Sequence, residues 1–183
     1  MLTIIVIDTE TGGLDATRCA LLSVAAVAMR QPGEITARFH SYVNPPKGLD
    51  LDPAAYAVNG LTQRPDWPSE AFVMAELQTC VGECSPSIIA GCNTAFDAAF
   101  INAACHRSHM RDLIQRGTLD LASLALAAHL KGTISLPLKY GSPSTSLDSI
   151  LGALGMARPD GMHSALADAT LTALDIAALL WRK

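Results

Sequence analysis

The apolar residues of this chain fall in short runs whose spacing alternates between that of strands and that of helices. Residues 2–8 form an unbroken β-prone run that ends at Asp8, as expected of a central strand buried on both faces. Residues 20–30 and 35–43 predict two further strands, joined by a Pro/Gly turn at 31–34 that suits an antiparallel hairpin. The first quarter of the chain therefore predicts three antiparallel strands.

Helical patterns dominate the rest of the sequence. Two short apolar strands are predicted at 87–90 and 118–119, each followed by a helix. This order of elements, three antiparallel strands followed by strand–helix units, predicts an α/β domain. The expected helices cover residues 53–58, 69–81, a segment containing Asp97, 120–130, 145–154 and 164–181.

Length and composition favour a single catalytic domain over residues 1–183. The chain is 50% hydrophobic and 16% charged, which is enough to bury a full core. Its longest apolar stretch, residues 20–29, is interrupted by Ser23 and is too short to span a bilayer. We therefore expect a soluble, cytoplasmic protein that is not bound to a membrane.

The formal net charge of −4 excludes a protein that holds nucleic acid by a broad basic face. Two bound divalent cations would bring the loaded protein close to neutrality. Contact with phosphate should then be local and centred on metal, and binding should be weak and non-processive unless a partner adds affinity.

Four carboxylates and one histidine lie in three short segments that are far apart in the chain. Asp8 and Glu10 occur in I-D-T-E-T-G-G-L, Asp97 in C-N-T-A-F-D, and His163 with Asp168 in H-S-A-L-A-D. Carboxylates are the hard oxygen ligands that divalent cations prefer, and a nearby imidazole can take a proton. The set fits a site for two divalent cations with a general base.

The spacing within each segment constrains where these side chains point. Asp8 and Glu10 are two residues apart on a strand, so both leave on the same face and can share a cation. His163 and Asp168 are five residues apart, which on one helix places them roughly 140° apart. We therefore expect Asp168 within a helix and His163 at its mobile lead-in, the loop of residues 155–161.

These three segments resemble the Exo I, Exo II and Exo III motifs of the DEDDh 3′–5′ exonucleases, and all five signature positions match in order. That family includes the proofreading, DnaQ-like epsilon subunits of bacterial replicases, and RNase T and oligoribonuclease are relatives. The resemblance covers essentially the whole chain. It implies a ribonuclease H-like fold: a mixed five-stranded sheet in the order 3-2-1-4-5, with strand 2 antiparallel, flanked by helices.

The resemblance also implies a two-metal hydrolase that releases nucleoside 5′-monophosphates from the 3′ end of single-stranded nucleic acid, with DNA favoured. Asp8 is expected to bridge two Mg²⁺ or Mn²⁺ ions. Glu10 and Asp168 should complete the tighter metal site, and Asp97 should serve the looser one. His163 should accept the proton of the attacking water.

Further positions match family residues that contact the 3′ nucleotide. In the glycine-rich turn that follows Glu10, free N–H groups are expected to bind the 3′ hydroxyl or the terminal phosphate. Asn59, and Cys92 ahead of Asn93, stand where the family commonly has histidine, so the details of substrate contact are open. The expected substrate-binding residues are Thr11, Gly12, Leu14, Val58, Asn59 and Phe96.

Several alternatives stay open at the level of sequence. The chain fits an RNA-trimming exoribonuclease of the RNase T or oligoribonuclease type, because few contacts read the 2′ hydroxyl. A non-catalytic module that binds nucleic acid or a polymerase is less consistent with five intact motif positions. Both a homodimer and a polymerase-bound monomer fit. The irregular segment 131–146, which carries Lys131, Lys139 and Tyr140, is expected to influence substrate choice.

The cysteines suggest packing rather than cross-linking. Their number is odd, and their surroundings are mostly apolar, as expected of reduced core residues in a cytosolic protein. A zinc site is the weaker alternative, formed by Cys80 and Cys84 with His106 and His109.

Overall fold

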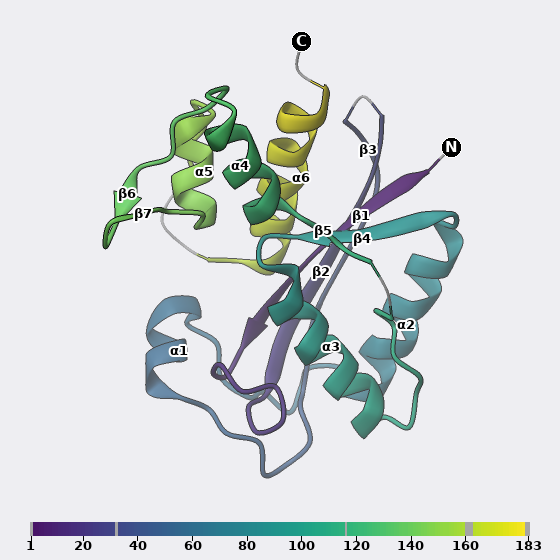
Figure 1. The fold of residues 1–183 in the computed structure, drawn as a ribbon. Coiled ribbons are helices and arrows are strands. Elements are labelled where there is room, and N and C mark those ends of the chain that lie inside the picture. Colours follow the sequence, from purple (N-terminus) through teal and green to yellow (C-terminus); the bar gives the residue numbers. More distant parts are fainter. Residues whose placement is uncertain (1, 32, 116, 160–162, 182–183) are drawn as a thin grey trace.

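The computed structural model describes residues 2–31, 33–115, 117–159 and 163–181. Its main sheet has the order β3-β2-β1-β4-β5, with β2 antiparallel to both of its neighbours and the pairs β1–β4 and β4–β5 parallel. The predicted mixed sheet and ribonuclease H-like topology are confirmed (Figure 1). The strands of this sheet are β1 (Thr3–Thr11), β2 (Leu21–Arg30), β3 (Glu34–Tyr42), β4 (Ser87–Gly91) and β5 (Leu119–Asp120).

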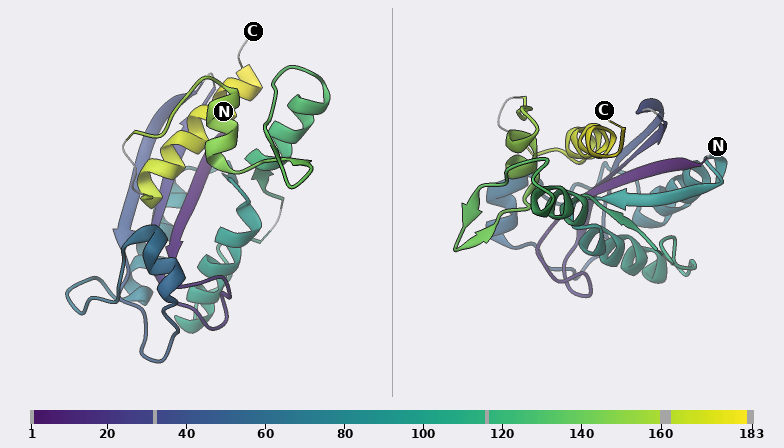
Figure 2. Two further views of the ribbon diagram at one scale, coloured as in Figure 1. Left: turned by 90° about the vertical axis from the view of Figure 1, so that its left-hand side faces the viewer. Right: turned by 45° about the horizontal axis from the view of Figure 1, so that its top comes forward.

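Helices cover both faces of the sheet. Helices α2 and α3 pack on one face, and α6 packs on the other with α4 and α5 beside it (Figures 1 and 2). No helix in the described ranges is both long enough and apolar enough to cross a bilayer. The helices are α1 (Pro53–Asn59), α2 (Glu70–Glu83), α3 (Thr94–Arg107), α4 (Leu121–Leu130), α5 (Leu147–Ala153) and α6 (Ala165–Trp181).

The central strand β1 is buried on both sides, which explains its unbroken apolar run. Ile5 and Ile7 belong to the core under α2 and α3, whereas Ile4 and Val6 belong to the core under α6. Because side chains alternate along a strand, Asp8 continues the face of Ile4 and Val6. The acids at the end of β1 therefore face the side of the sheet on which α6 lies.

Asp120 fixes the start of α3 as well as that of its own helix. Its carboxylate accepts a hydrogen bond from the Ser123 backbone N–H at 3.0 Å and so caps α4. Its second oxygen accepts from the Thr94 backbone N–H at 2.9 Å, at the first residue of α3. The helix that carries Asp97 is thereby tied to the end of β5.

The segment 131–146 is more ordered than the sequence suggests. It contains a small hairpin of β6 (Leu138–Lys139) and β7 (Ser142–Pro143). Tyr140 and Gly141 form its turn, with φ of 51° and 80°. Two consecutive residues of positive φ are typical of a two-residue hairpin turn, a signal that the aromatic at the first position conceals.

Asp175 is a buried carboxyl group without a partner. Its side chain lies within α6 and is completely buried, and neither oxygen has a hydrogen-bond partner in the described part of the chain. Burial raises the pKa of Asp175 from 3.8 to about 7. The folded protein therefore binds a proton at this site more tightly than the unfolded chain does.

Replacing Asp175 with Leu, which has nearly the same shape, should increase stability, most of all at alkaline pH. A raised carboxyl pKa costs nothing below pH 4, and its cost grows until pH exceeds the folded-state value near 7. At about 1.4 kcal/mol per pKa unit, the variant should gain up to about 4 kcal/mol at pH 8 relative to pH 4. Urea unfolding at both pH values measures this difference. Asp175→Asn should remove the pH dependence too, and an unchanged pH profile in both variants would contradict the assignment.

Candidate active site

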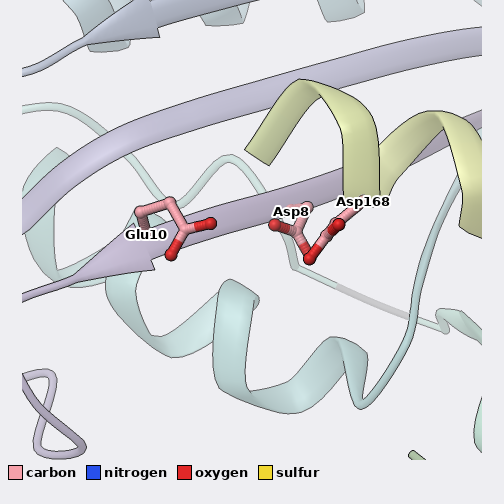
Figure 3. A group of neighbouring side chains, drawn as sticks. All are labelled: Asp8, Glu10 and Asp168. Atoms are coloured by element: carbon pink, nitrogen blue, oxygen red, sulfur yellow. The ribbon is translucent and has the colours of Figure 1, made fainter. Parts of the chain in front are cut away.

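Three of the predicted acids meet at one point. Asp8 and Glu10 lie on β1 and Asp168 on the first turn of α6, and one oxygen from each lies within 4.8 Å of the others (Figure 3). Since α6 packs on the face of the sheet that carries Asp8 and Glu10, its first turn arrives beside them. Asp8 is partly exposed, while Glu10 and Asp168 are buried. The group has the hard oxygen donors that Mg²⁺ and Mn²⁺ prefer.

Asp97 lies close to this group but outside the set of three. It is buried in the first turn of α3, on the opposite face of the sheet. The Thr9 hydroxyl donates a hydrogen bond to its Oδ1 at 2.7 Å. Thr9 stands between Asp8 and Glu10 and points the other way, so the same strand end orients acids on both of its faces.

His163 lies just before α6, as the five-residue spacing predicted. Its Nδ1 is 3.3 Å from the Asp168 Oδ2, and its side chain is 39% exposed. Residues 155–159 of the expected lead-in are described, whereas Asp160 and Gly161 lie outside the described residues. The predicted division, with Asp168 inside the helix and His163 ahead of it, matches the structure.

The carboxylates strongly influence one another. Burial raises the pKa of Asp8 well above its ordinary value, and the negative charges of Asp97 and Glu10 raise it further. Burial also raises the pKa of Asp97 to about 7, against the lowering effect of the Thr9 hydrogen bonds. The pKa of Glu10 is raised by burial and lowered in part by Asn59. Such a cluster favours bound cations, which stabilise every ionised acid at once.

Sequence reasoning missed Arg158. This largely buried side chain forms ion pairs with Asp168 and, at 3.1 Å, with Asp148 at the start of α5. Its positive charge lowers the pKa values of Asp8 and Glu10. A lone arginine in an irregular stretch carries no sequence signal, because only the fold brings it to the acids.

A largely apolar pocket of about 340 Å³ opens beside Glu10, between the end of β1, α1 and the start of α3. Leu14 is 88% exposed and Val58 is 58% exposed, so neither serves the core. Phe96 is half-buried and packs on Phe100. Of the six predicted substrate-binding residues, five line this pocket: Thr11, Leu14, Val58, Asn59 and Phe96.

Gly12, the sixth, is not among the lining residues, and its backbone N–H is not free. That N–H donates to the Ala20 carbonyl at 2.7 Å, and the Gly12 carbonyl accepts from the Asp52 N–H at 2.6 Å. A Cβ at Gly12 would lie 2.7 Å from the Asp50 carbonyl oxygen. The expected free donor at Gly12 was therefore wrong: a glycine is needed there because neighbouring backbone packs against it.

Asn59 has a structural role in addition to its place in the pocket. Its side-chain amide donates to the Thr11 carbonyl at 3.0 Å, and its Oδ1 accepts from the Leu61 N–H at 2.9 Å. The residue thus ties α1 to the end of β1. Cys92, the other departure from the family pattern, has a pKa raised by burial to about 12.

The cysteines behave as packing residues. All five are free, and Cys19 and Cys105 are buried. In the described ranges, the group of Asp8, Glu10 and Asp168 is the one set of three or more side chains arranged to hold a metal ion. The alternative zinc site is thus not formed.

A ribonuclease H-like sheet with acids gathered at the end of its central strand has the architecture of a nuclease. The exonuclease family model named for ribonuclease T matches residues 5–174. Ribonuclease T of Pectobacterium atrosepticum is 31% identical over 199 residues, covering 98% of this chain and 82% of that protein. The chain therefore belongs to the exonuclease family, and the prediction from the DEDDh motifs is confirmed.

Other relatives are covered less completely. Ribonuclease T of Shewanella oneidensis is 29% identical over an aligned region that covers 66% of this chain and 61% of that protein. The PolC-type DNA polymerase III of Latilactobacillus sakei is 30% identical over 68% of this chain, which spans 8% of the polymerase. Exonuclease I of E. coli, solved with a dT13 oligonucleotide, aligns with 97% of this chain and 40% of its own at a TM-score of 0.82 and 21% identity. At 21% identity, the similarity to exonuclease I shows the fold alone.

Proposed function

We propose that this protein hydrolyses single-stranded nucleic acid from its 3′ end and releases nucleoside 5′-monophosphates, with DNA as the favoured substrate. The observation that carries the proposal is the position of the Asp8, Glu10 and Asp168 cluster at the edge of a largely apolar pocket of about 340 Å³. Glu10 is a member of the acid cluster and also lines the pocket. An acid cluster beside a pocket of this size suits removal of one end residue at a time.

Asp8, Glu10 and Asp168 would hold one divalent cation, Mg²⁺ or Mn²⁺, and Asp97 would help to hold a second. When bound, such cations activate the attacking water and stabilise charge on the leaving 3′ oxygen. The geometry and the all-oxygen donor set fit hard cations of this kind. Arg158 balances part of the negative charge that surrounds Asp168.

His163 is the proposed general base. If its Nδ1–H donates to Asp168, the lone pair lies on Nε2, and the ring is oriented by the carboxylate. Its partial exposure allows Nε2 to reach a water molecule in the site. Asp168 would thus have two roles, because one of its oxygens faces His163 while the carboxylate belongs to the acid cluster.

The pocket explains the proposed choice of end. Leu14, Val58 and Phe96 offer apolar surface to the base and sugar of the last nucleotide. Thr11 and Gly13 line the pocket at the turn after β1, where the Thr11 hydroxyl donates to the Gly13 carbonyl at 2.7 Å. A strand that continues past this point would meet the turn.

Digestion of end-modified oligonucleotides tests the proposal. A linear single strand with a free 3′ hydroxyl should be shortened one nucleotide at a time, and a 3′ phosphate should inhibit. Matched blunt duplexes should react more slowly than frayed ends, because opening a terminal pair costs about a few kcal/mol. A closed circular single strand is the control that should survive. Cleavage of that circle, or release of nucleotides from the 5′ end, would overturn the proposal.

RNA is the second candidate substrate, since several relatives of this chain are ribonuclease T proteins, one of them 31% identical over 98% of the chain. Matched single-stranded DNA and RNA oligonucleotides, digested side by side, decide between the two. Faster degradation of RNA would assign the chain to RNA trimming. A polymerase partner, a homodimer and a cytoplasmic location stay predictions.

A further inference from the structure

The tip of the β6–β7 hairpin carries side chains that the fold does not use. Tyr140 is fully exposed, and Leu138 is 70% exposed. Tyr140 also adopts a φ of 51°, a conformation that Asn, Asp or Gly adopts at lower cost than an aromatic residue. An aromatic residue that bears backbone strain and packs against nothing indicates a binding role.

The hairpin stands on supports that connect it to the candidate active site. Below the tip, Leu136 is buried in the core under α6. After the hairpin, the Thr145 carbonyl lies 3.9 Å from the thiol of Cys92, the residue that follows β4. The hairpin is therefore fixed at its base to the end of β4, the strand that pairs with β1.

A second connection runs through ion pairs. Asp148, in the first turn of α5 just beyond the hairpin, contacts Arg158 at 3.1 Å, and Arg158 pairs with Asp168. The hairpin and α1 project from the same side of the molecule (Figures 1 and 2), and α1 lines the pocket beside Glu10. A strand that leaves the pocket on this side would pass near the tip.

The charge of residues 131–147 indicates which kind of ligand the tip would bind. Residues 131–147 contain two lysines and no acidic residue, although the whole chain has a net charge of −4. One of these lysines, Lys139, directly precedes Tyr140 at the tip. A cation beside an exposed aromatic ring matches the phosphate and the base of a single strand.

We propose that Lys139 and Tyr140 bind the single strand on the 5′ side of the scissile bond, with a base stacked on the Tyr140 ring and a phosphate held by Lys139. This inference rests on the proposed function, since it supplies the upstream contact for the same substrate. It also gives a protein with a net charge of −4 a local place to hold the nucleic acid strand between cuts.

Substrate length separates this contact from the catalytic centre. Tyr140→Ala and Lys139→Ala should each raise KM for a single-stranded 15-mer, by about tenfold for Tyr140→Ala. Hydrolysis of the p-nitrophenyl ester of thymidine 5′-monophosphate, which is one nucleotide long, should stay at the wild-type rate in both variants. Tyr140→Phe keeps the ring and should behave as wild type.

Phe72→Ala is the matched control, because Phe72 is an exposed aromatic on α2, a helix far from the hairpin (Figure 1). It should leave both substrates unaffected. Fluorescence anisotropy of a labelled 15-mer, with Ca²⁺ in place of Mg²⁺, gives a binding readout that needs no turnover. There Tyr140→Ala should weaken binding by a similar factor.

Three results would overturn the inference. The first is an unchanged KM and an unchanged anisotropy in Tyr140→Ala, and the second is an equal loss of activity of this variant on the one-nucleotide ester. The third is a wild-type dimer that becomes a monomer in Tyr140→Ala, measured by light scattering. The last result would show that the tip binds a second copy of the chain. If the wild type cleaves neither substrate, the proposed function fails, while the anisotropy comparison still tests the tip.

Discussion

Asp8→Asn should abolish nuclease activity, with a fall in kcat/KM of about a thousandfold or more, while the fold is retained. Asparagine keeps the shape of the side chain and removes the charge at the centre of the acid cluster. Burial, and then the charges of Asp97 and Glu10, raise the pKa of Asp8, so loss of its carboxylate removes a buried charge and relieves repulsion. In EDTA the variant should therefore melt at a higher temperature than the wild type.

Differential scanning fluorimetry with and without Mg²⁺ completes the test. The wild type should be stabilised by Mg²⁺, and Asp8→Asn should lose most of that shift, since a cation stabilises only the state that binds it. Asp66→Asn is the control, as Asp66 makes a surface ion pair with Arg64 and lies outside the cluster. Turnover near the wild-type rate in purified Asp8→Asn would remove the cluster from the mechanism.

His163→Ala should reduce the rate by roughly 100- to 10,000-fold and should keep metal binding. A base accepts a proton only when it is neutral, so the wild-type rate should rise with pH, and part of that rise should depend on His163. Ionisation of Asp97, whose pKa burial raises to about 7 in the metal-free protein, acts in the same direction because only the charged form holds a cation. The variant should lose the histidine part of this rise and keep the part due to the acids.

The pH profile of kcat/KM and the Mg²⁺-induced shift in melting temperature measure these two properties separately. His106→Ala serves as the matched control, because His106 pairs with Asp112 at the surface. A full-rate His163→Ala enzyme would exclude histidine as the base. Loss of the Mg²⁺ shift would instead show that His163 acts through the arrangement of Asp168.

Local patterns predicted the strands, the helices and the directions of the acids well, whereas the order of the sheet was implied by the family resemblance. The unbroken run before Asp8 identified a strand buried on both faces, and the spacing of two residues placed Glu10 on the same face. The spacing of five residues separated His163 from the helix that holds Asp168. These relations depend on periodicity within one element, which a single sequence records directly.

Contacts between distant segments were not predictable in the same way. Arg158 reaches Asp168 from an irregular stretch, and Asp175 occupies a buried helix position where an apolar residue would be expected. The backbone partners of Gly12 come from segments up to 40 residues further along the chain. In each case packing sets the surroundings of the residue, and the residue type alone does not reveal them.

The orientation of Thr9 limits how this family of sites can change. Asp8 and Glu10 face one side of β1 while Thr9 reaches Asp97 on the other side, and the strand is paired residue by residue with β2 from Ile4 to Glu10. A single inserted or deleted residue within β1 would exchange the two sides for everything beyond it. Evolution can therefore change the length of the 131–146 segment far more freely than the two-residue spacing between Asp8 and Glu10. Differences in substrate among such proteins should accordingly arise in the 131–146 segment.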